Sequence, residues 1–350
     1  MTTLTPSAPD QASPQAPATH QPMTSLAPAS NAVVPAVTAR QPSQPQRLSK
    51  GANAALGMQS AAANLWNNEM STLTRRLGEL RQGNDQGGVW TRALGAELNV
   101  DSGYSRAFDQ RLSGAQIGAD GALEKAGGTL YLGGMLGAGH SDQDFGEQSS
   151  GKLDSQSIGV YATFLRDDGW YLDSVIKYDH LKGDVRITNN VGGRVHGDYS
   201  ADAYGASIEL GRQIALGQGW FVEPQAQLAA AHVQGSTYTS SDGLQVDADA
   251  VDSLQARVGG RVGRNLVFDS GAQLQGYMNA SWIDELAGDS QVAVNGHGLD
   301  NALPGARGEV GGGAALLLGT RHKISVEADY ANGHEIEQPL AITVGYRYLW

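Results

Sequence analysis

Apolar and polar residues alternate along the chain from about residue 87 to the C-terminus, and Gly, Asp and Asn interrupt the alternation at regular intervals. In the clearest stretch, the apolar residues Trp170, Leu172, Ile176 and Tyr178 alternate with the polar residues Asp173, Lys177 and Asp179. A period of two predicts β-strands with one apolar and one polar face. Soluble β-sandwiches and membrane β-barrels both contain such strands, so the alternation alone does not separate these folds.

The lengths of the connections between strands do separate them. Tight connections occur at 125–128, 167–169, 217–219, 269–271 and 319–321, and longer polar ones lie near 101–110, 141–153, 183–198, 236–246, 286–302 and 331–338. The two kinds alternate strictly, which is typical of barrels in the bacterial outer membrane, with tight periplasmic turns and long extracellular loops. The pattern predicts an all-β fold, a twelve-stranded antiparallel transmembrane β-barrel over residues 85–350. Because the number of strands is even, the first and the last residue of the barrel both lie on the periplasmic side.

Aromatic residues near the ends of the predicted strands support a barrel. Barrels of the outer membrane carry a girdle of aromatic residues at each lipid–water interface. The residues that we assign to the girdles are Trp90, Trp170, Trp220, Tyr346, Tyr348 and Trp350.

A helical pattern precedes the strands and predicts an α-helix over residues 51–84. Apolar residues at helical spacing are Leu56, Ala63, Trp66, Met70, Leu73, Leu77 and Leu80, which place one apolar stripe along the helix. Arg75, Arg76 and Arg81 suit the C-terminal end of the helix dipole, and Gly83 suits a helix stop. Such a helix either fills the barrel lumen or lies on the surface of a globular domain.

The first 50 residues differ from the rest of the chain. Nine of the twelve prolines lie there, among Ala, Ser, Thr and Gln. This composition cannot bury enough apolar surface to offset the loss of chain entropy, so we predict a disordered linker over residues 1–50. Because the first residues lack the basic and apolar regions of a secretory signal, we expect a C-terminal fragment or a mis-assigned start.

Composition excludes several classes of function. No run of about 18 apolar residues is present, which excludes a helical membrane protein. A net charge of −12 argues against nucleic acid as a partner, and the absence of cysteine excludes thiolate metal sites. His140 with Asp142 could suggest a metal site or a protease dyad, but no ligand spacing repeats, and solvated loop histidines explain the pattern better. We therefore expect no metal and no cofactor.

Glycine-rich runs, at GGTLYLGG (127–134) and GGGAALLLG (311–319), have neither the lysine nor the strand-to-helix context of a phosphate-binding loop. We interpret them instead as barrel positions where small residues make room for the helix.

Four short motifs resemble the β-domain of pertactin-type autotransporters, which are proteins of type V secretion. These are LTRRLGELR at 73–81, VWTR at 89–92, GWFVEPQAQLA at 219–229 and the ending VGYRYLW. The resemblance covers about residues 66–350. It implies a helix that threads the lumen of a twelve-stranded barrel, a linker that emerges at the cell surface, and a last strand, ending at Trp350, that is recognised by the barrel-assembly machinery.

In many members of this family the helix is cut inside the barrel, where an Asn side-chain amide attacks its own backbone carbonyl. The resemblance places Asp173, Glu209 and Glu223 at lumenal positions linked to that cleavage, and Tyr161 at a less clear match. A charged pore lining that binds the helix arginines explains the same acids. At the cut position this chain has Ser71 and Thr72, and serine cannot cyclise in this way.

The nearest alternative residues for such a cut are Asn67 and Asn68, one helical turn away, which is about 6 Å at 1.5 Å per residue. Intramolecular catalysis requires far closer placement. We therefore expect an uncleaved barrel and no enzyme activity, with Asn67 and Asn68 as polar residues that face a wet lumen.

These patterns predict an outer-membrane translocator and anchor that carries an N-terminal passenger or linker to the bacterial cell surface. A surface adhesin or immune-evasion factor, acting through extracellular loops or a passenger, is the alternative and would connect the protein with virulence. We expect a monomer whose partners are outer-membrane lipid, lipopolysaccharide and the barrel-assembly machinery, with host surface molecules as further candidates.

Overall fold

The computed structural model describes residues 48–74, 86–189 and 191–350, and it contains one helix and seventeen strands within these ranges. The helix is α1 (Lys50–Thr74). Most of the predicted linker, and the part of the predicted helix that includes Arg75, Arg76, Leu77, Leu80, Arg81 and Gly83, lie outside the described residues.

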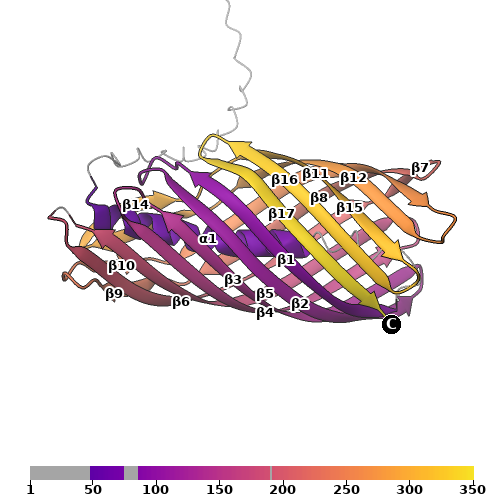
Figure 1. Ribbon diagram of the computed structural model, residues 1–350, viewed down its shortest axis with the longest axis horizontal. Helices are drawn as coiled ribbons and strands as arrows, with labels where there is room; N and C mark the ends of the chain where they lie inside the picture. The colour runs from indigo at the N-terminus through magenta and orange to yellow at the C-terminus, as the bar shows by residue number, and fades with distance from the viewer. Residues whose placement is uncertain (1–47, 75–85, 190) are drawn as a thin grey trace, which may run out of the picture. The chain divides into compact units, whose positions relative to one another are not determined.

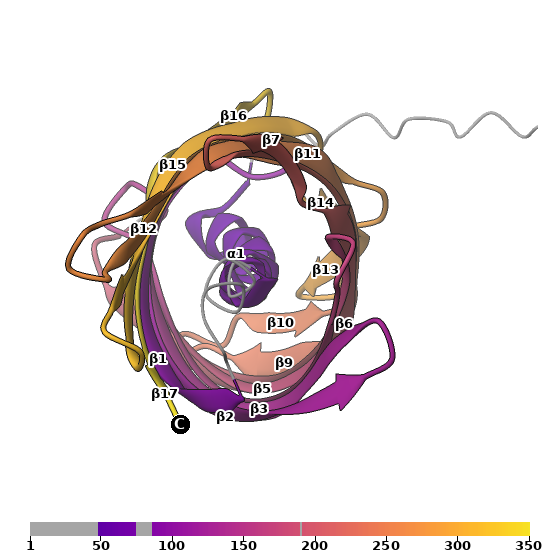
Figure 2. The same ribbon diagram turned by 90° about the vertical axis from the view of Figure 1, so that its right-hand side faces the viewer.

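Twelve long strands form a closed antiparallel barrel (Figures 1 and 2). They are β1 (Gly87–Val100), β2 (Phe108–Lys125), β3 (Gly128–Asp144), β4 (Ser150–Arg166), β5 (Trp170–Thr188), β6 (Arg194–Arg212), β8 (Trp220–Val233), β11 (Val251–Val267), β12 (Gln273–Glu285), β15 (Arg307–Leu318), β16 (His322–Gly333) and β17 (Ile336–Leu349). Pairing of β8 with β11 and of β1 with β17 completes the cylinder, and the short β7 (Ile214–Gly217) extends the β6–β8 hairpin. The predicted fold class is confirmed.

The barrel has two different ends. At the turn end, where Gly88 lies opposite Leu349, the connections are 126–127, 167–169, 218–219, 268–272 and 319–321. Gly127, Gly169, Gly271 and Gly319 adopt φ values between 62° and 89° there, which only glycine reaches without strain. At the opposite end, the loop end, the connections are 101–107, 145–149, 189–193, 234–250, 286–306 and 334–335.

Three of the expected long loops are short. The predicted loops at 141–153, 183–198 and 331–338 shrink to 145–149, 189–193 and 334–335, because the strands continue past their expected ends. In the extensions of β5 and β6 the outward side chains, such as Arg186 and His196, are polar, while inward ones such as Val185, Ile187 and Val195 are apolar and buried. This is the reverse of the membrane-spanning part of the strands, and polar outward residues resemble those of a loop.

Two other loops at this end carry a second sheet. Its strands are β9 (Ser236–Thr239), β10 (Gln245–Ala248), β13 (Asp289–Val294) and β14 (His297–Ala302), in the order β14-β13-β10-β9. The mouth sheet, as we call these four strands, packs on the first turns of α1: Ala52, Ala55 and Leu56 form one apolar cluster with Val246, Val292 and Val294.

The two faces of the barrel wall have the reverse arrangement of a soluble protein. Large apolar side chains such as Ile158, Ile176 and Val258 point outward and are 55–65% exposed. Charged side chains such as Asp173 and Lys177 point inward and are 1% exposed. A soluble sandwich would bury the apolar face, so this arrangement excludes it. Among the described residues, no helix combines the length and the apolar character needed to cross a membrane.

One predicted girdle residue points the other way. Trp90 is fully buried and donates a hydrogen bond from Nε1 to the Tyr161 hydroxyl at 2.6 Å. A Cβ on Gly118, on the neighbouring strand β2, would lie 2.4 Å from the Trp90 ring, so glycine leaves the room that the indole occupies. The outward aromatic residues Trp170, Trp220, Tyr346 and Trp350 lie near the turn end, and Tyr178, Tyr204, Trp282 and Tyr330 lie nearer the loop end.

Candidate functional site

Helix α1 lies inside the barrel (Figure 2), and nearly all of its side chains are buried. It begins at the loop end, where the Ser49 hydroxyl accepts a hydrogen bond from the Ala52 amide at 3.1 Å, a helix N-cap. Its polar residues Gln59, Asn64, Glu69 and Thr72 are buried together with its apolar ones. The described residues of the predicted apolar stripe are all buried, but α1 also buries its polar positions, because the wall surrounds it on all sides.

Polar groups of the wall hydrogen bond to α1 along its length. Gln110 on β2 donates to the Ala61 carbonyl at 3.0 Å and accepts from the Asn64 amide at 3.1 Å. Near the end of α1, Arg92 on β1 donates to the Thr72 carbonyl, and Gln116 on β2 donates to the Glu69 carbonyl at 3.2 Å. A buried polar group costs free energy unless it is paired, so these contacts select one position for the helix.

A buried ion cluster connects α1 with the wall. Lys177 Nζ on β5 lies 2.7 Å from Glu69 Oε2 on α1 and 3.0 Å from Asp179 Oδ2 on its own strand. The Ser155 hydroxyl on β4 donates to the other Glu69 oxygen, and the Lys177 ammonium lies 5.0 Å from the centre of the Trp66 ring. The side chains of Lys177, Glu69 and Asp179 are at most 3% exposed.

Small residues of the wall make room for this part of α1. A Cβ on Gly139 would lie 2.1 Å from Glu69 Oε1, and a Cβ on Gly205 would lie 2.6 Å from the Trp66 ring. The glycine-rich runs that we expected to serve this purpose do something else. Gly133 faces the Tyr161 ring and Gly313 faces the Tyr277 ring, each with an ideal Cβ within 2.5 Å of the aromatic side chain.

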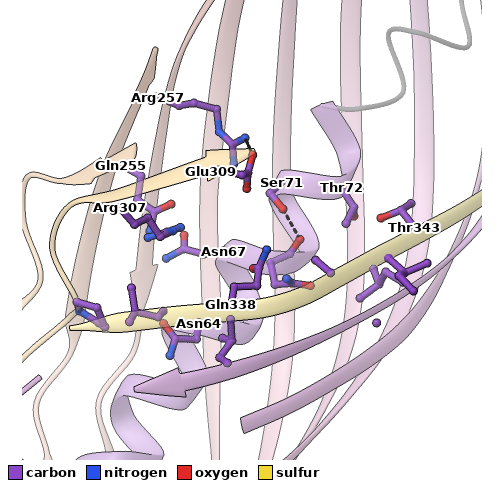
Figure 3. Close-up of a pocket in the computed structure, with 18 of the residues that line it drawn as sticks. Asn64, Asn67, Ser71, Thr72, Gln255, Arg257, Arg307, Glu309, Gln338 and Thr343 are labelled. Atoms are coloured by element: carbon purple, nitrogen blue, oxygen red, sulfur yellow. Dashed lines mark hydrogen bonds and ion pairs between the residues drawn. The ribbon is translucent and has the colours of Figure 1, made fainter. Parts of the chain in front are cut away.

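The predicted Asn67 and Ser71 lie on the side of α1 that faces a pocket (Figure 3), and Glu69 does not line this pocket. Asn64, Asn67, Asn68, Ser71 and Thr72 line one pocket. Its opposite walls come from β1, β11, β15 and β17 and include Gln255, Arg257, Arg307, Glu309, Gln338 and Thr343. The Asn67 amide donates to the Ser253 hydroxyl at 3.3 Å, and the Ser71 hydroxyl donates to the Asn68 carbonyl at 2.9 Å.

The predicted acids lie elsewhere on the wall. Asp173 on β5 and Glu209 on β6 are direct cross-strand partners, and Glu223 on β8 pairs with Arg261 on β11. The Thr163 hydroxyl donates to Asp173, and the Tyr171 hydroxyl donates to Glu209 at 2.7 Å. None of the three acids lines the pocket beside Asn67 and Ser71. Asp173 and Glu209 thus lie together, while the predicted set of acids and asparagines does not converge on one pocket.

Tyr161 belongs to a third group, near the turn end. Its hydroxyl donates to Asp120 on β2 at 2.8 Å, and Arg347 on β17 contacts the same carboxylate through two nitrogens at 2.5 and 2.9 Å. Arg347 and Asp120 side chains are fully buried. The Asp120–Arg347 pair links the last strand to β2 across β1, and bidentate geometry makes such a pair strong and directional.

Sequence reasoning assigned no role to Glu69, Lys177, Asp179, Asp120 or Arg347. Lys177 and Asp179 share the inward parity of Asp173 on β5, so the alternation places all three in the lumen. What the sequence lacks is any sign that Glu69, 108 residues away, lies opposite Lys177. Among the described residues, no cluster of three or more His, Asp or Glu could hold a metal ion.

Comparison with known proteins agrees with this architecture. The sequence model of the autotransporter β-domain family matches residues 89–330. The pertactin autotransporter of Bordetella bronchiseptica is 37% identical over 90% of this chain, and the BrkA autotransporter of Bordetella pertussis is 35% identical over 87% of it. The matched regions make up only 35% and 30% of those two proteins, so the chain spans about a third of their length.

Solved structures show the same fold. The crystal structure of the β-domain of the Bordetella autotransporter BrkA matches with a TM-score of 0.66 and 32% identity, over 76% of this chain and all of that one. The translocator domain of NalP from Neisseria meningitidis matches with a TM-score of 0.68 over 85% of this chain and all of that one, at 17% identity, and supports the fold alone. From its sequence, its closed twelve-stranded wall and the helix inside it, this chain belongs to the autotransporter β-domain family, the outer-membrane translocators of type V secretion.

Proposed function

We propose that this barrel carries the segment before α1 to the bacterial cell surface and then holds it there, with α1 left uncut in the lumen as a permanent plug. The observation that carries the proposal is the path of the helix. Helix α1 begins at the loop end, where the outer-membrane family has its cell-surface side, and continues towards the turn end. The first residues that the structure describes therefore lie at the end of the barrel that this proposal places at the cell surface.

The contacts of α1 support its role as an anchor. Breaking a buried ion pair leaves an uncompensated charge in a low-dielectric site, which costs roughly 3–5 kcal/mol. Any movement of α1 along the lumen would separate Glu69 from Lys177 and would therefore cost this free energy. The mouth sheet adds apolar contacts to the first turns of the helix. These two sets of contacts, at different heights, keep the helix from leaving through either end.

The surroundings of Ser71 support the absence of self-cleavage. Asn cyclisation needs an amide nitrogen that is free to reach its own backbone carbonyl carbon. At the family position this chain has Ser71, whose hydroxyl bonds to the Asn68 carbonyl, and the Asn67 amide donates to the wall. The residues from Lys50 to Thr74 keep helical geometry throughout.

Two measurements test this proposal. The chain is expressed with a signal peptide and an N-terminal tag, antibody against the tag is applied to intact cells, and the mass of the barrel is measured from purified outer membranes. We expect labelled cells and an intact mass. Unlabelled cells with a folded barrel would contradict surface delivery, and a barrel that begins at Asn68 or Thr72 would contradict the permanent anchor. In that second case, Asp173→Asn would show whether the predicted acid takes part.

Partners follow from the same placement. We propose that the barrel-assembly machinery recognises β17, the strand that closes the cylinder and ends next to Trp350. We also propose that the protein acts as a monomer surrounded by lipid and lipopolysaccharide. We assign adhesion to host molecules to the segment before α1, because the mouth sheet is packed on the helix. Attachment assays with a variant that lacks residues 1–47 would test that assignment.

A further inference from the structure

The outward faces of β4, β5 and β6 form a continuous surface with two parts. Cross-strand neighbours lie side by side in rows that run across the three strands. Towards the turn end, the outward rows are apolar: Val160 with Ile176 and Ala206, then Ile158 with Tyr178 and Tyr204. Ile158, Val160 and Ile176 are 55–62% exposed. This part fits acyl chains, and the tyrosines mark the level of the lipid headgroups.

Beyond the tyrosines, the rows become charged without a break. The next row holds His180 and Asp202, and the following rows hold Asp154 with Lys182 and Lys152 with Asp184. Lys182 lies four residues beyond Tyr178, which is roughly 13 Å along the strand. Lys152, Lys182 and Arg186 line one hollow together with Asp154, Asp184 and Asp198. The hollow therefore holds three cations and three carboxylates side by side, in a chain with a net charge of −12.

These cations are available for a ligand. Lys182 forms no ion pair with any residue that the structure describes. Lys152 lies 3.6 Å from Asp142 and Arg186 lies 2.9 Å from Asp184, and the two cationic side chains are 48% and 62% exposed. Exposed pairs of this kind contribute little, so a phosphate can replace the carboxylate at small cost.

We propose that the outer face of β4, β5 and β6 binds a phosphorylated glycolipid of the outer leaflet, with its acyl chains on the apolar rows and its phosphates on Lys152, Lys182 and Arg186. The inference rests on the placement of the barrel in the outer membrane. Basic clusters directly above an apolar surface recognise anionic headgroups, and each cation contributes about 1 kcal/mol.

The carboxylates in the hollow favour a glycolipid over an ordinary phospholipid. Asp154, Asp184 and Asp198 alternate with the cations. They would repel a ligand that offers phosphate alone, but they accept hydrogen bonds from sugar hydroxyls and bind the divalent cations that accompany several phosphates.

Binding of a rough lipopolysaccharide, lipid A with its inner core, tests the proposal. The full chain is refolded in detergent without lipid, folding is checked by its electrophoretic mobility with and without heating, and bound glycolipid is measured by native mass spectrometry. The variant is Lys152→Gln/Lys182→Gln/Arg186→Gln. The matched control removes three cations of the turn end, as Arg212→Gln/Arg264→Gln/Arg321→Gln.

We expect the loop-end variant to bind on the order of a hundredfold more weakly, about fivefold for each cation, and the control to bind as wild type. If the triple variant does not fold, Lys182→Gln alone should weaken binding about fivefold. Equal affinity of wild type and the loop-end variants would overturn the proposal. The proposal would also be overturned if phosphatidylglycerol or inorganic phosphate displaced the glycolipid as well as a second glycolipid does. The site would then bind any anionic lipid, or free phosphate.

The same variants separate this inference from the proposed function. Surface labelling of the N-terminal tag on intact cells depends on α1 and the lumen, none of whose residues is changed. We expect the loop-end variant to display the tag as wild type does. Loss of glycolipid affinity with normal display supports the site. Normal glycolipid affinity of the loop-end variant overturns the site, whatever its display, whereas unlabelled wild-type cells with a folded barrel overturn the proposed function and not the site.

Discussion

Removal of the lysine from the buried ion cluster should release α1 from its position in the lumen. In the variant Lys177→Met, the Glu69 and Asp179 carboxylates lose the ammonium that lies 2.7 and 3.0 Å from them. Two neighbouring buried carboxylates without a cation repel each other and remain desolvated. Because breaking a buried pair costs roughly 3–5 kcal/mol, the ratio of seated to displaced helix should fall by a factor on the order of 100 to 1,000 or more.

Conductance of single barrels in planar bilayers measures this change, because a displaced helix opens the lumen. We expect wild type to stay closed and Lys177→Met to open frequently, with faster amide hydrogen exchange in α1. The control is Lys182→Met, a similar change on the outward face of the same strand. It should behave as wild type.

A compensated variant separates charge from packing. Lys177→Met combined with Glu69→Gln and Asp179→Asn leaves no buried charge in the cluster, so much of the seated population should return. If Lys177→Met conducts and exchanges as wild type does, the ion cluster does not hold the helix. If the compensated variant stays as open as Lys177→Met, lost packing rather than charge is the cause.

Three further perturbations follow from the wall. Gly139→Ala places a Cβ 2.1 Å from a carboxylate oxygen of α1 and should lower the free energy of unfolding by about 1–3 kcal/mol. Gly276→Ala, whose Cβ would meet open space, should leave it unchanged. Urea unfolding followed by fluorescence compares the two variants with wild type. Arg347→Met leaves Asp120 buried without its cation and should cost about 3–5 kcal/mol in the same assay, so an unchanged midpoint would contradict a structural role. Burial raises the pKa of Tyr238 on the mouth sheet from 10.0 to about 12. The stability that this phenol contributes is therefore complete below pH 10 and is lost as the pH rises towards 12. The difference between the ultraviolet titrations of wild type and Tyr238→Phe measures the pKa of this phenol, and a midpoint near 10 would contradict its burial.

The architecture could be predicted from the sequence because its signals are local. Alternation along a strand and the lengths of connections both act over a few residues, and each repeats around the barrel. Alternation does not show which residue points outward where two apolar residues are adjacent, as at Val89 and Trp90, because either of the two could face the lipid. Gly118, which leaves space for the indole, is on another strand, and the sequence alone does not show that the two are neighbours.

The site was harder to predict for the same reason. The inward parity of Asp173, Glu209 and Glu223 could be read from their strands, and the structure places them on the lumenal wall. Their partners depend on the rotation of α1 and on its depth in the barrel. Glu69 meets Lys177 while Asn67 and Ser71 face a pocket between other strands, and nothing in a helical sequence fixes that rotation. The absence of cleavage at Ser71 therefore stays a prediction.

Pairing of the first and last long strands has a consequence for how the protein acquires its structure. Gly88 and Leu349 are neighbours in space and lie at opposite ends of the barrel sequence, so the seam between β1 and β17 joins strands of very large sequence separation and raises the contact order of the barrel. Non-local pairing of this kind is slow, and until it is complete both strands present unpaired edges that can aggregate. The cylinder therefore gains its closed, edge-free state only when its final residues arrive, and a chain shortened by one strand would keep two open edges.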